Sequence, residues 1–319
     1  MSAPVVLPAD GPAAPPRVDV LASGPAEPPR RGPRVVPPGV QVFTTAITIL
    51  SVTLLGFGAY MAFVSRLHHD RAQFVSYANF RKDLAQGTAP TGQTQPEDPS
   101  KLLELGTPVA VLDIPQLHRK EVVFEGTTGE VMEKGPGHRR DTPLPGQPGA
   151  SVIMGKATTY GGPFKDLSAL VPGDEFTVTT GQGEHRFKVL DVRHGGMPQP
   201  PPPAAGTGRL VLTTAYGGMF APTDALRVDA DLISEVKPAP RQVFKASQLM
   251  PSEQVMAIDR GVWFPLVFIG EALLLAVGLL SAARVYWGTW QTWIVAVPVV
   301  GFLGLATADQ VSRLLPNLI

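Results

Sequence analysis

The chain has 319 residues, with 27 basic and 27 acidic side chains and a formal net charge of zero. This length accommodates one or two domains. The balanced charge and an aromatic content of 7% argue against a nucleic-acid partner. There is no cysteine, which excludes disulfides, thiolate nucleophiles and cysteine-based metal sites. We expect neither a metal nor a cofactor.

The N-terminal part of the sequence divides into a tail and an apolar segment. Residues 1–41 are rich in proline and alanine and bury too little apolar surface to offset the entropy of ordering, so a disordered tail is predicted. Residues 42–64 carry no charge. As a helix they extend for roughly 34 Å, enough to cross a hydrocarbon core of about 30 Å. They are predicted to form the first transmembrane helix.

Two further apolar segments lie near the other end of the chain, at residues 261–283 and 287–308. Tryptophans sit near their ends, as in the aromatic belts of membrane proteins. Because only a few residues separate the two segments, a membrane hairpin is predicted, followed by a short tail over 309–319.

A more polar region lies between the first apolar segment and the hairpin. Residues 65–107 are predicted to form a stalk helix and a linker, and residues 236–260 a connector. From 108 to 235 the pattern consists of short apolar or alternating runs separated by glycine and proline turns. That pattern is typical of a β-sandwich or a β-barrel with at most short helices.

This β-rich region resembles the sortase domain, and most closely the class E type of actinobacteria. The resemblance rests on three stretches: EKGPGHRRDTPLPGQPGASVIMGKATTYGGPFKDLSALVPGD (133–174), RLVLTTA (209–215) and LRVDADL (226–232). It implies a mainly β fold, a sortase-like β-barrel with short helices, here combined with three transmembrane helices. It does not extend to the hairpin.

The resemblance also implies a chemistry. Sortases are cysteine transpeptidases that cut a sorting signal after threonine and transfer the acyl group to an amine. Their thiolate attacks, a histidine protonates the leaving amine, and an arginine stabilises the oxyanion. Aligned on the family's motifs, Lys156 stands at the histidine position, Ala215 at the cysteine and Ala225 at the arginine. All three positions have changed, so they are interpreted as relics.

The remaining side chains do not restore this chemistry. The ordinary pKa of a lysine is about 10.4, so the pKa of Lys156 would have to be lowered strongly for it to act as an acid or base near neutral pH. The methyl group of Ala215 cannot attack a carbonyl, and losing the nucleophile of a hydrolytic triad costs on the order of a millionfold in turnover. Thr214 points to the opposite face of the strand, and Thr213 is displaced about 7 Å along the same face. We therefore expect no catalytic residue.

A binding role in the former groove remains. Arg227 lies two residues after Ala225 on the same strand face; it is interpreted either as a cationic partner of Lys156 for a carboxylate or as a surface arginine. The candidate groove residues are His138, Lys156, Thr158, Tyr160, Thr213 and Arg227.

Two other patterns are rejected as sites. The segment around Lys156 is no phosphate loop, because five residues separate Gly149 from Gly155 and Ala157 follows the lysine. Residues 68–70 (HHD) project about 100° apart on a helix, so they are interpreted as an interfacial polar cluster and not as a metal site.

Glu271 is the unusual residue of the predicted spans. An ionisable group inside a span costs a few kcal/mol and normally faces protein. It is interpreted as a group that holds helices together by hydrogen bonds, or as part of a seam, meaning a contact surface for a partner membrane protein. Both interpretations are preferred to proton transport. Hydroxyl groups of the first span are the expected partners: Thr44, Thr45, Thr48, Ser51 and Thr53.

The sequence leads to three functional hypotheses. The first is a multi-pass, membrane-anchored sortase-like pseudoenzyme that binds or scaffolds a protein or peptide at the cell envelope, with its barrel outside the cell. The second is an active transpeptidase with non-standard groups. The third is a subunit of a membrane-protein complex in which the barrel is a spacer. Basic residues flank both sides of the first span, so the external barrel rests on the resemblance alone.

Overall fold

The computed structural model describes residues 37–219 and 221–319. Most of the predicted tail (1–41) lies outside the described residues. The first helix, α1 (Pro38–Ala59), starts four residues earlier than the predicted span. It passes through one π-helical turn, η1 (Tyr60–Val64), into α2 (Ser65–Gln86). Gly87 ends α2 in a left-handed conformation, which glycine adopts at no steric cost.

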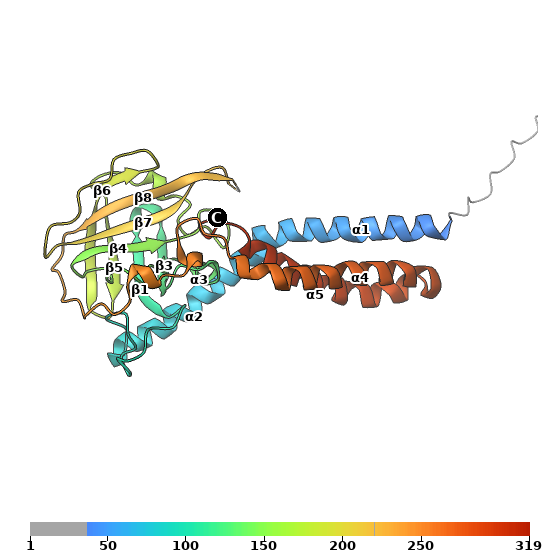
Figure 1. The fold of residues 1–319 in the computed structure, drawn as a ribbon, viewed down its shortest axis with the longest axis horizontal. Helices are drawn as coiled ribbons and strands as arrows, with labels where there is room; N and C mark the ends of the chain where they lie inside the picture. The colour runs from blue at the N-terminus through green and yellow to red at the C-terminus, as the bar shows by residue number, and fades with distance from the viewer. Residues whose placement is uncertain (1–36, 220) are drawn as a thin grey trace, which may run out of the picture. The chain divides into compact units, whose positions relative to one another are not determined.

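Eight strands form a closed barrel in the order β1-β2-β3-β4-β7-β8-β6-β5 (Figure 1). The expected β-barrel is thus confirmed. The strands are β1 (Pro108–Ile114), β2 (Arg119–Glu125), β3 (Gly137–His138), β4 (Gly149–Met154), β5 (Glu175–Thr180), β6 (Gly183–Arg193), β7 (Gly208–Gly217) and β8 (Pro222–Leu232). The β2–β3 and β4–β7 pairs are parallel, and the others are antiparallel.

The barrel interior is filled by aliphatic and aromatic side chains, as the alternating pattern predicts. Strand β6 shows that alternation, with every second residue from His185 to Val189 buried. Phe176 and Phe187 stack with ring centroids 5.8 Å apart inside the main core. Short helical elements lie outside the strands: α3 (Gly129–Lys134), η2 (Pro115–Leu117) and η3 (Leu167–Ala169).

The hairpin consists of α4 (Trp263–Trp287) and α5 (Thr289–Arg313), joined at Gly288. Both helices begin two residues later and end four or five residues later than predicted. Figure 1 shows α1 running alongside them, and Arg284 of α4 donates a hydrogen bond of 3.0 Å to Thr45 of α1. These three helices are long and apolar enough to cross a membrane.

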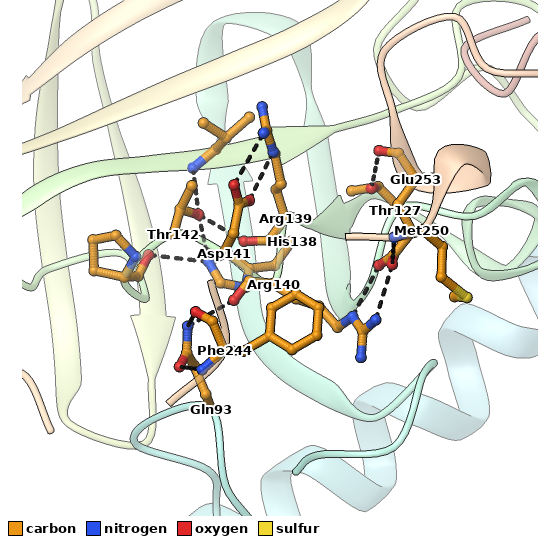
Figure 2. A network of polar contacts seen from close by, with 12 residues as sticks. Gln93, Thr127, His138, Arg139, Arg140, Asp141, Thr142, Phe244, Met250 and Glu253 are labelled. Atoms are coloured by element: carbon orange, nitrogen blue, oxygen red, sulfur yellow. Dashed lines mark hydrogen bonds and ion pairs between the residues drawn. The ribbon is translucent and has the colours of Figure 1, made fainter. Parts of the chain in front are cut away.

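The connector between β8 and α4 crosses the barrel surface. It contains three 3₁₀ turns, η4 (Ala246–Gln248), η5 (Pro251–Glu253) and η6 (Arg260–Val262). Arg140 forms a double hydrogen bond to the fully buried Glu253, with both distances 2.9 Å (Figure 2). The side-chain oxygen of Gln93 accepts from the backbone N–H of Phe244 at 2.9 Å. These contacts attach the connector to the barrel wall.

The predicted partners of Glu271 are wrong. Its side chain is exposed, and no hydrogen bond within residues 37–219 and 221–319 involves it. Hydroxyl groups of Thr44, Thr48 and Thr53 instead donate to backbone oxygens of their own helix. Thr45 accepts from Arg284.

The interpretation of residues 68–70 as a polar interfacial cluster also needs correction. His69 is only 4% exposed because α2 packs against the barrel, and its Nε2 lies 3.1 Å from the buried carboxylate of Glu121. Asp70 remains exposed beside Arg66.

Candidate functional site

The strand register brings the three relic positions together. Ala215 of β7 lies directly opposite Ala225 of β8, which places their side chains on one face. Strand β4 runs parallel to β7 with Met154 opposite Thr213. Lys156 follows β4 by two residues, so it reaches the level of Ala215. The structure therefore gathers Lys156, Ala215 and Ala225 where β4 and β7 end and β8 begins.

The loop after β4 has a backbone that few sequences can adopt. A Cβ atom at Gly155 would lie 2.6 Å from the ring of Phe164, so only glycine fits there. Tyr160 has a φ of 50°, in the left-handed region, and two glycines follow it with positive φ. This turn places the Lys156 Nζ 5.4 Å from the centroid of the Tyr160 ring, a distance that permits a cation–π contact.

The end of the described chain fills the space between these residues. We call residues 317–319 the docked tail, and the space that it occupies the relic pocket. The backbone N–H of Ala157 donates to the Leu318 oxygen at 2.8 Å. The ammonium of Lys156 donates to the Ile319 oxygen at 3.2 Å, and the Thr159 hydroxyl donates to the same oxygen. Leu318 and Ile319 are fully buried.

Apolar contacts complete the docking of Leu318. It belongs to one buried cluster with Met132, Met154 and Ala225, and Ala215 packs against that cluster. Two of the relic positions, Ala215 and Ala225, therefore lie in the apolar cluster that holds Leu318.

Asn317 joins the docked tail to the connector. Its backbone N–H donates to Ala257 at 2.9 Å, and its side-chain amide donates to Gln254 at 2.8 Å. The same amide donates to the backbone oxygen of Thr127, next to α3, at 3.0 Å. Thr127 in turn donates to the Glu253 oxygen at 2.7 Å. Barrel, connector and docked tail thus form one hydrogen-bonded unit.

Two ionisable groups are buried at the pocket. Burial lowers the pKa of Lys156 to about 8, against the opposing effect of the Glu133 carboxylate. Burial raises the pKa of Glu133 to about 7, although Arg313 and Lys156 favour its charged form. The Arg313 Nε lies 3.8 Å from Glu133. Burial and Glu133 also raise the pKa of Tyr160, whose hydroxyl lies 3.1 Å from the Ser312 Oγ.

Several predicted groove residues lie around this pocket in different ways. Thr158 donates to the Met219 oxygen at 3.2 Å at the exposed rim. Thr213 is buried in β7, opposite Arg227 of β8. Arg227 is partly exposed, and no hydrogen bond or ion pair in the described parts of the chain links it to the docked tail. Its role in binding stays a prediction.

His138 lies in a separate polar network (Figure 2). Its imidazole bonds to Glu125 at 2.9 Å and to the Pro143 oxygen at 3.0 Å, and it is 1% exposed. Burial lowers the pKa of His138, but the Glu125 carboxylate outweighs that effect and raises it overall. The residue lines a cavity of about 380 Å³ that also includes Gln147 and Pro240. Among the residues that the structure describes, no hydrogen bond or ion pair joins His138 to the docked tail.

Sequence reasoning missed the docked tail, Thr159 and Glu133. One signal was present: the last six residues, LLPNLI, carry no charge. Uncharged aliphatic residues are more often buried against protein than exposed to water, so their position directly after a membrane helix favours contact with another part of the protein. Nothing in the local periodicity indicated that these residues would be buried in a pocket whose lining lies 160 residues earlier in the chain.

The comparisons with known proteins concern the barrel. Residues 112–228 match the family model of the Sortase domain, which is less than half of the chain. Sortase D of Bacillus subtilis (strain 168) is 28% identical over 90 residues, covering 28% of this chain and 44% of that protein. The chain therefore spans less than half the length of that curated relative.

Two solved sortase structures also match part of the chain. A Sortase D5 transpeptidase of Clostridium perfringens covers 52% of this chain and 98% of its own, with 19% identity and a TM-score of 0.40. Sortase E from Streptomyces avermitilis covers 41% of this chain and 91% of its own, with 30% identity and a TM-score of 0.35. The matched family region lies wholly within the strands and loops of the barrel, and by that match the barrel of this chain is a sortase-family domain.

Proposed function

We propose that this protein is a membrane-anchored sortase-like pseudoenzyme whose barrel binds a protein or peptide partner at the cell envelope. The observation that carries the proposal is the meeting point of β4, β7 and β8. It presents a buried lysine and two methyl groups to an aliphatic segment. Acyl transfer requires a nucleophile within reach of a base, and Ala215 offers neither an oxygen nor a sulfur.

Lys156 is a poor substitute for the missing groups. With a pKa lowered to about 8, it holds an appreciable neutral fraction near pH 7.5. Its Nζ nevertheless donates to the Ile319 oxygen, and the side chain is 3% exposed. An incoming carbonyl carbon therefore finds the amine already occupied and covered.

The direct test is an activity assay on the full chain in detergent micelles. Sorting-signal peptides and an amine acceptor are added, and mass spectrometry looks for cleavage products and for an acyl–protein adduct. We expect neither, while an active sortase assayed in parallel gives both. Turnover that is lost in Lys156→Met or Thr213→Val would instead support an enzyme with non-standard groups.

The proposal places the barrel outside the cell. This follows from the sortase resemblance together with three helices of membrane-spanning length. Because the chain has no cysteine, Ala204→Cys in the exposed loop between β6 and β7 introduces a single thiol. In intact cells this thiol should react with a membrane-impermeant reagent. Protection until the cells are lysed would place the barrel inside.

The hypothesis of a membrane-complex subunit has one observation in its favour. Glu271 is exposed on α4 and lines an open concavity with Leu274 and Leu275. A carboxylate on a lipid-facing surface is costly unless another protein covers it. Recovery of the same membrane partner by the wild type and by a chain with a disrupted relic pocket would favour this alternative.

A further inference from the structure

The docked tail is held in the way that a peptide ligand is held. It adds no strand to the barrel. Its backbone oxygens receive hydrogen bonds from one loop, through Ala157, Lys156 and Thr159. Its two aliphatic side chains are fully buried. Backbone hydrogen bonds combined with pockets for side chains are the general means by which proteins bind extended peptides.

The changes that removed the sortase chemistry also create the space for this segment. Leu318 packs against Ala225 and Met154, with Ala215 at the edge of the same cluster. A long cationic side chain at position 225 would occupy the volume that Leu318 fills, because cores pack near crystal density. Aliphatic binding and the former chemistry therefore exclude each other at this point.

The docked tail is linked to α5 by residues 314–316. The last turn of α5 also contacts the residues around the pocket, through Tyr160 to Ser312 at 3.1 Å and Glu133 to Arg313 at 3.8 Å. A shift of α5 relative to the barrel would pull on all of these contacts together. The tail therefore has a mechanical link to a helix of membrane-spanning length.

We propose that the relic pocket is a binding site for a peptide segment with uncharged, mainly aliphatic side chains and that residues 317–319 are its tethered ligand. A partner peptide of the Asn-Leu-Ile type enters only when the tail leaves. This inference rests on the proposed binding function and adds the class of ligand and the way in which access is controlled.

The test uses a fluorescent peptide with the sequence of residues 312–319, SRLLPNLI. Its binding is measured by anisotropy to the full chain and to a variant that lacks residues 317–319, both in detergent micelles. We expect the shortened variant to bind at least tenfold more tightly. Adding Lys156→Met and Thr159→Val to the shortened variant should weaken binding, and a peptide carrying Leu318→Asp should not bind. Equal binding to the full and shortened chains would overturn the proposal.

A second variant covers the case in which the shortened chain fails to fold. Ala225→Cys with Leu318→Cys keeps residues 317–319 and introduces two thiols at positions that belong to one buried cluster. Oxidation should abolish peptide binding and reduction should restore it; identical binding in both states contradicts a tethered ligand. If a folded shortened chain binds no peptide, the tail is purely structural. That result leaves the absence of turnover, and thus the pseudoenzyme proposal, standing.

Discussion

Two buried basic side chains, His138 and Lys156, lie at the ends of neighbouring strands of the same barrel. Their bonding partners come from different parts of the chain. His138 ends β3, and the barrel wall supplies its carboxylate partner, Glu125, at 2.9 Å. Lys156 follows β4, and its ammonium donates to Ile319, 163 residues further along the chain. The partner of His138 thus belongs to the barrel itself. The partner of Lys156 belongs to the docked tail, so the barrel and the segment after the membrane hairpin contribute to one site.

The pKa shifts express the same difference. Burial lowers the pKa of His138, but the Glu125 carboxylate outweighs burial and raises it overall. The Glu133 carboxylate favours the charged form of Lys156, but burial prevails and lowers its pKa to about 8. One barrel thus holds an imidazole whose carboxylate partner belongs to the barrel wall and an amine that bonds to the docked tail.

The largest expected effect comes from breaking the network beside His138. Arg140→Leu leaves the fully buried carboxylate of Glu253 without its partner. Removing one member of a buried ion pair costs about 3–5 kcal/mol. We expect a loss of that order in the free energy of unfolding, measured by denaturant titration in micelles. Glu235→Gln removes an exposed partner of Lys237 and should leave the stability unchanged; similar losses in both variants would argue against the network.

The next largest effect is expected from shortening the side chain of Leu318 in the docked tail. Leu318→Ala deletes a fully buried side chain, and such changes cost about 2–5 kcal/mol. The loss should appear as local opening, because the docked tail is a short segment at the edge of the barrel and not one of its strands. Hydrogen exchange of the Ala157 N–H, which donates to Leu318, should therefore accelerate at least tenfold. Leu190→Ala, at a half-exposed position of β6, is the matched control; unaltered protection of Ala157 would show that the tail is not docked.

A smaller effect should follow pH at Lys156. The folded chain releases this proton near pH 8 and the unfolded chain near 10.5, so between these values the unfolded state holds more protons. Stability should therefore rise from pH 8 towards 9.5, by at most about 1.4 kcal/mol per pH unit. Lys156→Met should remove this slope. Lys165→Met, at an exposed position, should keep it; a slope that survives in Lys156→Met would assign it to another group.

The smallest effect on folding is expected at Glu271. Because the side chain is exposed and forms no hydrogen bond within the described residues, Glu271→Ala should change stability by about 0.5 kcal/mol or less. It should nevertheless weaken recovery of a membrane partner from native membranes, while Glu271→Gln retains part of that recovery. Full recovery with both variants would contradict a seam at α4.

The sequence predicted what depends on local patterns. Short apolar or alternating runs over 108–235 indicated a β-sandwich or a β-barrel. The resemblance to sortases led to the barrel and to Lys156, Ala215 and Ala225, which the strand register then brought together. The docking of Leu318 was out of reach, because contacts between distant segments leave no periodicity. The burial of His69 against Glu121 was missed for the same reason. The residues next to His69 in the sequence indicated only the surface of a helix and gave no sign of its partner Glu121.

The central claim, that the docked tail fills the relic pocket, is tested most directly by a cross-link in native membranes. With Ala225→Cys and Leu318→Cys as the only thiols, mild oxidation should form an intramolecular disulfide in most molecules, seen as a loss of reactive thiol. Ala204→Cys paired with Leu318→Cys should not react in this way, because Ala204 lies in the exposed loop between β6 and β7. No more cross-linking at 225 than at 204 would show that the pocket is empty of the tail, and the account would be wrong.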